Sequence, residues 1–240
     1  MINQNINITE PYKIRSLRSK QGIAIFDTFK SQNNKFTGEA RRQRKIIVHL
    51  ATEQSPELRT RTSIAQIIAK KQGVLWQNMY SGIFRDIDEV LIPSGVVKEG
   101  GRLPLRRGPK ALQMEGVPFY ELSESGLLVA SALEELGRSR MQVLESLIKS
   151  VSICDPDEEA VRQAMLLLVR FIPSFMGKIV NLYVRAYSAG LANGVTPIDI
   201  KKLRSVVASE IRIEKEIIDS SSRLGVKEWE IIKQFVDLIS

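Results

Sequence analysis

The spacing of apolar residues predicts two neighbouring helices, joined by a turn, between residues 62 and 92. In the first helix, residues 62–71, Ser63 is expected to act as the cap and Gln66 to reach back to the backbone N–H of that cap. Gly73 then interrupts the pattern. The apolar residues of this segment, which share one helical face, are Ile64, Ile67 and Ile68.

The second predicted helix covers about residues 75–92 and separates apolar from polar side chains. Its apolar stripe, which is expected to face a core, consists of Met79, Ile83, Ile87, Val90 and Leu91. Its opposite face carries side chains able to meet base edges and phosphates, namely Gln77, Asn78, Ser81 and Arg85. Gly82 lies inside this helix, where glycine costs about 1 kcal/mol relative to alanine.

Two short extended segments with a basic loop between them follow the helices. Pro93 ends the helical pattern, and residues 96–98 are apolar enough to begin a strand. The second extended segment, residues 117–122, leads into a new helix that begins in the sequence SESG. The basic residues of the intervening loop are Arg102, Arg106, Arg107 and Lys110.

This order of elements, from Ala40 to about Leu136, resembles the winged helix-turn-helix superfamily of transcription regulators. The most specific part is RRGPK followed by FYELSESG, which is similar to the wing and wing exit of regulators of the MarR, PadR and related archaeal groups. The resemblance implies a mainly α fold with a small β-wing, a recognition helix at about 75–92 and a wing at about 99–117.

The resemblance also implies a function, sequence-specific binding of double-stranded DNA in transcription regulation. Base contacts are then expected from Gln77, Asn78, Ser81 and Arg85. Phosphate or minor-groove contacts are expected from Arg102, Arg106, Arg107 and Lys110, and further phosphate contacts from Lys70 and Lys71. In such proteins the helix before this pair supports the others, so its cations Arg41, Arg42, Arg44 and Lys45 are expected to touch phosphate only at their edge.

The chain divides into three predicted regions. Residues 1–39 form a partly ordered basic arm and linker, which either lies along DNA phosphates or is a loose terminus. Residues 40–126 form the DNA-binding domain, and residues 127–240 are a helical region for dimerisation or effector binding. An apolar series there fits either a homodimer interface or packing within one chain, and it consists of Leu128, Leu133, Leu136, Val143, Leu144 and Leu147.

Basic residues are concentrated in the half that carries the predicted DNA-binding elements. Residues 1–110 contain 20 Lys and Arg against 9 Asp and Glu, whereas residues 111–240 contain 15 against 18. This asymmetry favours a polyanionic partner, because cations that neutralise phosphates release counterions and so drive binding. The alternative explanation is a solvated basic surface.

The residue types needed for several chemistries are nearly absent. Cys154 is the only cysteine and His49 the only histidine, which argues against a disulfide, zinc sites and His-dependent nucleophilic catalysis. No carboxylates occur as a pair in an apolar setting, so we expect no enzyme activity, catalytic residues, cofactor or metal. The polar start MINQNINITE is unlike a signal peptide and no apolar run is long enough for a membrane span, which favours the cytoplasm.

Two further alternatives concern the helical C-terminal region. A set of Met and aromatic residues is able to line a pocket for a small-molecule effector, although such a stripe is more often plain core: Met165, Phe171, Phe175, Met176, Tyr183 and Tyr187. Winged helices also serve as protein-interaction modules inside larger transcription or replication assemblies, in which case this region would be the working surface. A cluster such as RRGPK favours DNA over that second role.

Overall fold

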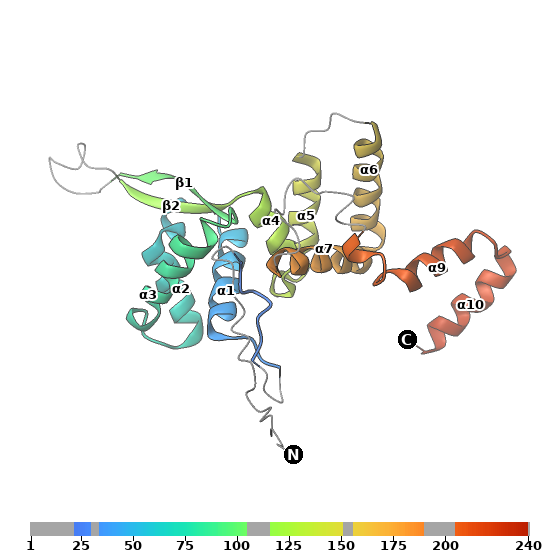
Figure 1. Ribbon diagram of the computed structural model, residues 1–240, viewed down its shortest axis with the longest axis horizontal. Helices are drawn as coiled ribbons and strands as arrows, with labels where there is room; N and C mark the ends of the chain where they lie inside the picture. Colours follow the sequence, from blue (N-terminus) through green and yellow to red (C-terminus); the bar gives the residue numbers. More distant parts are fainter. Residues whose placement is uncertain (1–21, 30–33, 105–115, 151–155, 190–204, 240) are drawn as a thin grey trace, which may run out of the picture.

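The computed structural model describes residues 22–29, 34–104, 116–150, 156–189 and 205–239, and Figure 1 shows their arrangement. Helices predominate, with one antiparallel hairpin after the first three. In chain order the elements, with η marking short 3-10 helices and the π-helix η2, are α1 (Gly38–Thr52), η1 (Pro56–Arg59), α2 (Arg61–Gln72), α3 (Gln77–Arg85), η2 (Asp86–Leu91), β1 (Val97–Leu103), β2 (Val117–Leu122), α4 (Glu124–Ser131), η3 (Glu134–Leu136), α5 (Ser139–Ser150), α6 (Pro156–Phe171), α7 (Pro173–Ser188), α9 (Arg212–Ser221) and α10 (Val226–Ile239).

Helices α1, α2 and α3 pack around a shared apolar core. Thr37 caps α1 by accepting a hydrogen bond from the N–H of Ala40, at 3.1 Å. The cap of α2 is Thr60, whose hydroxyl accepts from the N–H of Ser63, so the prediction of a Ser63 cap was wrong by three residues. Gly73 ends α2 in the left-handed conformation with φ of 67°, which glycine adopts without steric cost. Residues with no exposed surface in this core are Ile46, Ile47, Ile64, Ile83, Ile87 and Leu91.

The predicted helix at residues 75–92 forms in two parts. Residues Gln77–Arg85 are α-helical, and Asp86–Leu91 continue as a π-helix without a break in the chain direction. The predicted apolar stripe faces the core: Ile83, Ile87 and Leu91 are fully buried, and the other two members are partly buried against them.

Strands β1 and β2 form an antiparallel hairpin that begins with Val97 opposite Leu122. The register shifts between Glu99 and Gly101, which is a bulge in β1. Thr60, directly before α2, also forms an antiparallel bridge with Phe119 of β2. The hairpin is therefore tied to the start of α2. The predicted segment 117–122 is confirmed as β2, whereas the segment predicted at 96–98 begins at Val97 and continues to Leu103, so Arg102 lies on β1 and not in the predicted loop.

The core continues from the first three helices through α4 into α5 and α7. Residue 126, the predicted end of the DNA-binding domain, lies inside α4, whose cap is Ser123. Tyr187 of α7 donates a hydrogen bond to the carbonyl of Ser94, at 3.0 Å, and so links the helical region to the turn before β1. A piece of the predicted arm also joins this core, because Ile23, Ala24 and Ile25 are buried.

The apolar series predicted for dimerisation is used inside one chain. Leu128, Leu133 and Leu144 have at most 1% of their surface exposed, and Leu136 and Leu147 are also buried. These residues belong to helices that pack on one another within the chain, so the packing alternative is the one realised.

Helices α9 and α10 form an arm that projects from α7 (Figure 1), joined to it by an ion pair between Lys178 and Glu214 at 2.6 Å. The apolar residues of this arm are largely exposed, as described below. Across the described ranges of the chain, none of the helices combines the length and apolarity that crossing a lipid bilayer requires.

Candidate nucleic-acid interface

The outward face of α3 carries the four polar side chains predicted to contact bases. Gln77, Ser81 and Arg85 follow one another at four-residue intervals, opposite the buried Ile83, and all three are exposed. Asn78 is also exposed and lies at the edge of this polar stripe. None of the four makes a side-chain hydrogen bond or ion pair with another described residue, so their donors and acceptors are available to a ligand.

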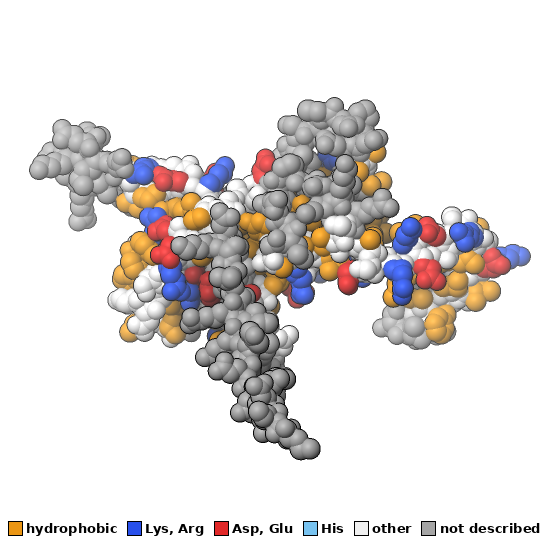
Figure 2. Space-filling model, viewed as in Figure 1, with side chains coloured by type: hydrophobic (Ala, Val, Ile, Leu, Met, Phe, Trp, Pro, Cys, Tyr) orange, Lys and Arg blue, Asp and Glu red, His pale blue; other side chains and the backbone are white. Residues whose placement is uncertain are grey.

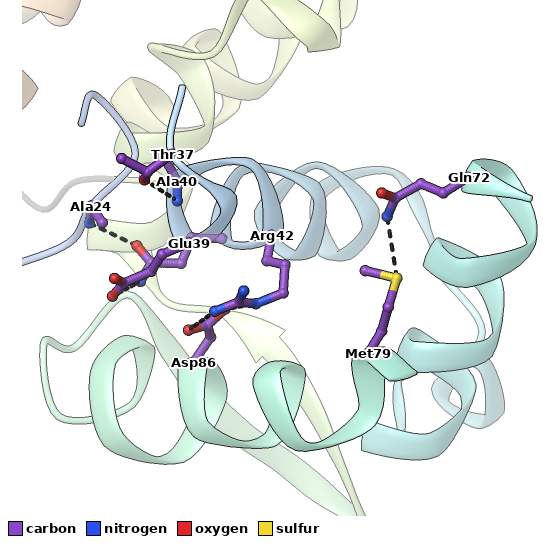
Figure 3. Close-up of polar contacts among 9 residues, drawn as sticks. Ala24, Thr37, Glu39, Ala40, Arg42, Gln72, Met79 and Asp86 are labelled. Atoms are coloured by element: carbon purple, nitrogen blue, oxygen red, sulfur yellow. Dashed lines mark hydrogen bonds and ion pairs between the residues drawn. The ribbon is translucent and has the colours of Figure 1, made fainter. Parts of the chain in front are cut away.

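An ion pair between Arg42 of α1 and Asp86, the residue directly after α3, holds these two helices together (Figure 3). Arg42 of α1 donates two hydrogen bonds to the carboxylate of Asp86, at 2.7 and 3.2 Å, and Asp86 has no exposed surface. Burial raises the pKa of Asp86, against the lowering effect of the hydrogen bond and charge of Arg42. The same side chain passes over Gly82, where an added Cβ would lie 2.9 Å from Arg42 Nε.

A second arginine fixes the opposite flank of α3 to the hairpin. Arg61, at the start of α2, forms an ion pair with Asp88 and lies over the rings of Phe84 and Tyr120, at 5.1 and 4.9 Å from their centroids. Because Tyr120 belongs to β2 and Phe84 to α3, this side chain holds the hairpin beside the helix. The polar stripe thus lies between a flank held by α1 and a flank held by the hairpin.

A groove of about 640 Å³ runs between α1 and α3. One wall carries the cations Arg41 and Lys45 of α1, and the other carries Asn78, Ser81 and Arg85 of α3. We call this hollow the α1–α3 groove. The groove thus places three of the residues predicted to contact bases opposite Arg41 and Lys45, which the sequence predicts to touch phosphate only at their edge.

The four cations of α1 have two different roles. Arg42 pairs with Asp86, and the buried Arg44 pairs with Glu135, donating from Nη2 at 2.6 Å. In contrast, Arg41 and Lys45 form no ion pair with any residue that the structure describes. The sequence groups all four as cations that touch phosphate at their edge, but Arg42 and Arg44 instead pair with carboxylates of the same chain.

Lys70 and Lys71 end α2 beside the turn into α3. Both are exposed and neither pairs with an acidic residue in the described ranges. Lys71 also lines a smaller hollow of about 360 Å³ with Arg41 and Lys45, so these cations form one basic surface on the α1 side of α3.

The predicted wing is only partly within the described residues. Arg102 of β1 is exposed and pairs with Glu99 at 2.8 Å, an interaction that is worth little in water. The predicted contacts of Arg106, Arg107 and Lys110 concern residues outside the part of the chain that the structure describes.

The lone histidine is a structural side chain. His49 is 5% exposed, and its Nε2 donates to the carbonyl of Leu58 at 2.9 Å. Burial lowers the pKa of His49, partly opposed by that hydrogen bond. Within the described ranges, no three or more His, Cys, Asp or Glu side chains gather as metal ligands would.

The Met and aromatic residues considered for an effector pocket do not share one environment. Met176 and Tyr183 are core residues, whereas Phe171 is 71% exposed. These residues therefore do not line one pocket.

Comparisons with protein-family models, curated proteins and solved structures returned no match for this chain.

Proposed function

We propose that residues 38–131 form a winged helix-turn-helix domain and that the protein is a sequence-specific regulator of transcription that binds double-stranded DNA. The order of α1, the bridging residue Thr60, α2, α3 and the β1–β2 hairpin supports this fold. In this proposal α3 enters the major groove and the hairpin lies along the neighbouring backbone as the wing.

The observation that carries the proposal is the polar stripe of α3. Gln77, Ser81 and Arg85 are exposed and make no side-chain hydrogen bond or ion pair with another described residue, and two arginine anchors, Arg42 and Arg61, hold their helix in place. A rigid helix with free donors is suited to reading base edges, and an arginine is well shaped to donate twice to one guanine. The cations on the α1 side supply the sequence-independent attraction that positions such a helix.

Binding and its salt dependence test this proposal directly. A mobility-shift titration on a random duplex at low salt should show binding whose affinity falls as salt rises. Selection from random duplexes should then yield a preferred sequence. On that sequence Arg85→Ala should cost about 1–3 kcal/mol and relax the preference at one position.

Two results would count against the proposal. Absence of any duplex binding at low salt would remove the DNA function. Equal losses for Arg85→Ala on preferred and random duplexes would mean that α3 does not read sequence, since phosphate contacts weaken all duplexes alike.

One observation favours the alternative, a protein-interaction module. Val74 and Leu75, at the turn before α3, are 46% and 70% exposed, and Trp76 follows them. Apolar side chains at the start of α3 suit a protein partner. The double variant Val74→Ser with Leu75→Ser tests this alternative. If it leaves duplex binding unchanged but weakens association of the protein with a transcription or replication assembly, this surface binds a protein and not DNA.

We further propose that the protein is a homodimer and that the α9–α10 arm supplies its interface. Five of the six residues of the earlier apolar series are buried within the chain, so that series offers little surface to a second copy. The arm instead exposes apolar residues on both of its helices, and Figure 2 shows them gathered beside its charged side chains. A two-fold dimer would present two α3 helices to two half-sites about one helical turn apart.

A further inference from the structure

The cations Arg41 and Lys45 lie one helical turn apart on the outward side of α1. Arg41 is exposed and Lys45 half-buried, and both line the α1–α3 groove. On the same helix, Arg42 and Arg44 form ion pairs with Asp86 and Glu135, which hold α1 to other parts of the fold. Arg41 and Lys45 form no ion pair with any of the described residues.

The electrostatics of the pair favour an anion from outside the chain. Burial lowers the pKa of Lys45, and the neighbouring charge of Arg41 lowers it further. Both effects disfavour the charged ammonium, and a phosphate close to the two side chains would offset both. Arg85 lines the same groove and forms no ion pair with a described residue, so it adds a third positive charge that attracts an anion.

The position of the pair relative to α3 indicates which phosphates are in reach. On one flank, Arg42 of α1 passes over Gly82 and pairs with Asp86. On the other flank, Arg61 lies over Phe84 and pairs with Asp88, beside the hairpin. A helix in the major groove, which is about 12 Å wide, has a sugar-phosphate backbone on each side. The hairpin occupies one side, so Arg41 and Lys45 face the backbone on the other.

We propose that Arg41 and Lys45, on the α1 wall of the α1–α3 groove, form a binding site for the phosphodiester backbone of duplex DNA. This inference rests on the proposed DNA-binding function and deepens it, because it adds a second line of phosphate contacts on the side of α3 away from the hairpin. The contacts fix the position of α3 and read no sequence.

The test compares two double variants of the full-length protein that remove the same charge. The first, Arg41→Ala with Lys45→Ala, removes the site. The control, Arg138→Ala with Arg170→Ala, removes two exposed arginines from the turn before α5 and from α6, neither of which pairs with a described carboxylate. Binding is measured by fluorescence anisotropy on a labelled random-sequence duplex and on the selected preferred duplex, over a series of salt concentrations.

The site variant should reduce the slope of log affinity against log salt by about two and weaken both duplexes by the same factor. The control should leave the slope close to that of the unchanged protein. Thermal unfolding of both variants should match the unchanged protein, since none of these side chains takes part in an ion pair within the described ranges.

Three results would overturn the inference. A site variant with the same slope as the control, while the unchanged protein binds duplex, would remove the phosphate site and leave the DNA function standing. A loss confined to the preferred duplex would mean that the pair reads bases. No binding by the unchanged protein at low salt would remove the proposed function itself, and the site with it.

Discussion

The glycine at position 82 is explained by Arg42, a residue 40 positions earlier in the chain. On the sequence alone, a glycine inside a helix is a cost of about 1 kcal/mol relative to alanine. In the structure Arg42 crosses α3 at this position on its way to the buried Asp86. A Cβ there would lie 2.9 Å from Nε and 3.2 Å from Cζ of the guanidinium, so an alanine at this position would displace the Arg42 side chain.

Gly82→Ala is therefore expected to destabilise the protein, although it improves helix propensity. Displacing Arg42 leaves the Asp86 carboxylate buried without its partner, which typically costs about 3–5 kcal/mol. Partial adjustment of the arginine and the gain in propensity reduce this, so we expect a loss of about 1–3 kcal/mol in the free energy of unfolding. Chemical denaturation measures it.

Ser81→Ala is the matched control, because the neighbouring Ser81 is exposed and points outward. It should change the free energy of unfolding by no more than about 0.5 kcal/mol. If Gly82→Ala instead stabilised the protein by about 1 kcal/mol, the ion pair would not constrain this position.

The elements themselves follow largely from local sequence, whereas their joints do not. Helical spacing of apolar residues predicts α2 and the run from α3 into η2, and the run VPFYEL matches β2. The cap of α2 was misplaced because Thr60, Thr62 and Ser63 all carry a hydroxyl able to cap a helix. What selects Thr60 is its bridge with Phe119, a contact across 59 residues that no local pattern reveals.

The corrected cap gives a measurable difference between two residues of one helix. Thr60→Ala removes the hydroxyl that accepts from the N–H of Ser63, so it should cost about 1 kcal/mol of stability. Gln66→Ala, which alters the partner expected from the sequence, should have almost no effect because Gln66 is exposed. Equal losses for the two variants, measured by thermal or chemical unfolding, would restore the original assignment of the cap.

At the scale of the whole molecule, the sequence indicates which half is basic but not which cations are free. Four cations lie within five residues of α1, and only their partners Asp86 and Glu135, which lie 44 and 91 residues away, decide that Arg42 and Arg44 are structural. Periodicity is similarly unable to separate a dimer interface from a core. Leu128 and Leu144 are buried by helices of the same chain, while Ile232 and Phe235, in a short terminal helix, are left exposed.

The arm carries many exposed apolar residues, which supports the proposed dimer interface. Nine residues expose between 40% and 87% of their surface, namely Ile213, Ile217, Ile218, Val226, Trp229, Ile231, Ile232, Phe235 and Val236. Four of them, Trp229, Ile232, Phe235 and Val236, recur at helical spacing on one face of α10.

A charge in the middle of that face should separate the two copies. Ile232→Glu with Phe235→Glu is expected to convert the dimer to a monomer in light scattering, because a dimer would bury both carboxylates without partners. Lys227→Gln, on the opposite side of α10, should leave the dimer intact. The monomeric variant should still bind a single half-site with reduced affinity, since α3 lies in a separate part of the molecule from the arm (Figure 1). If light scattering shows the unchanged protein to be a monomer at high concentration, self-association through the arm is ruled out. Each α3 would then bind a single DNA site without a partner copy.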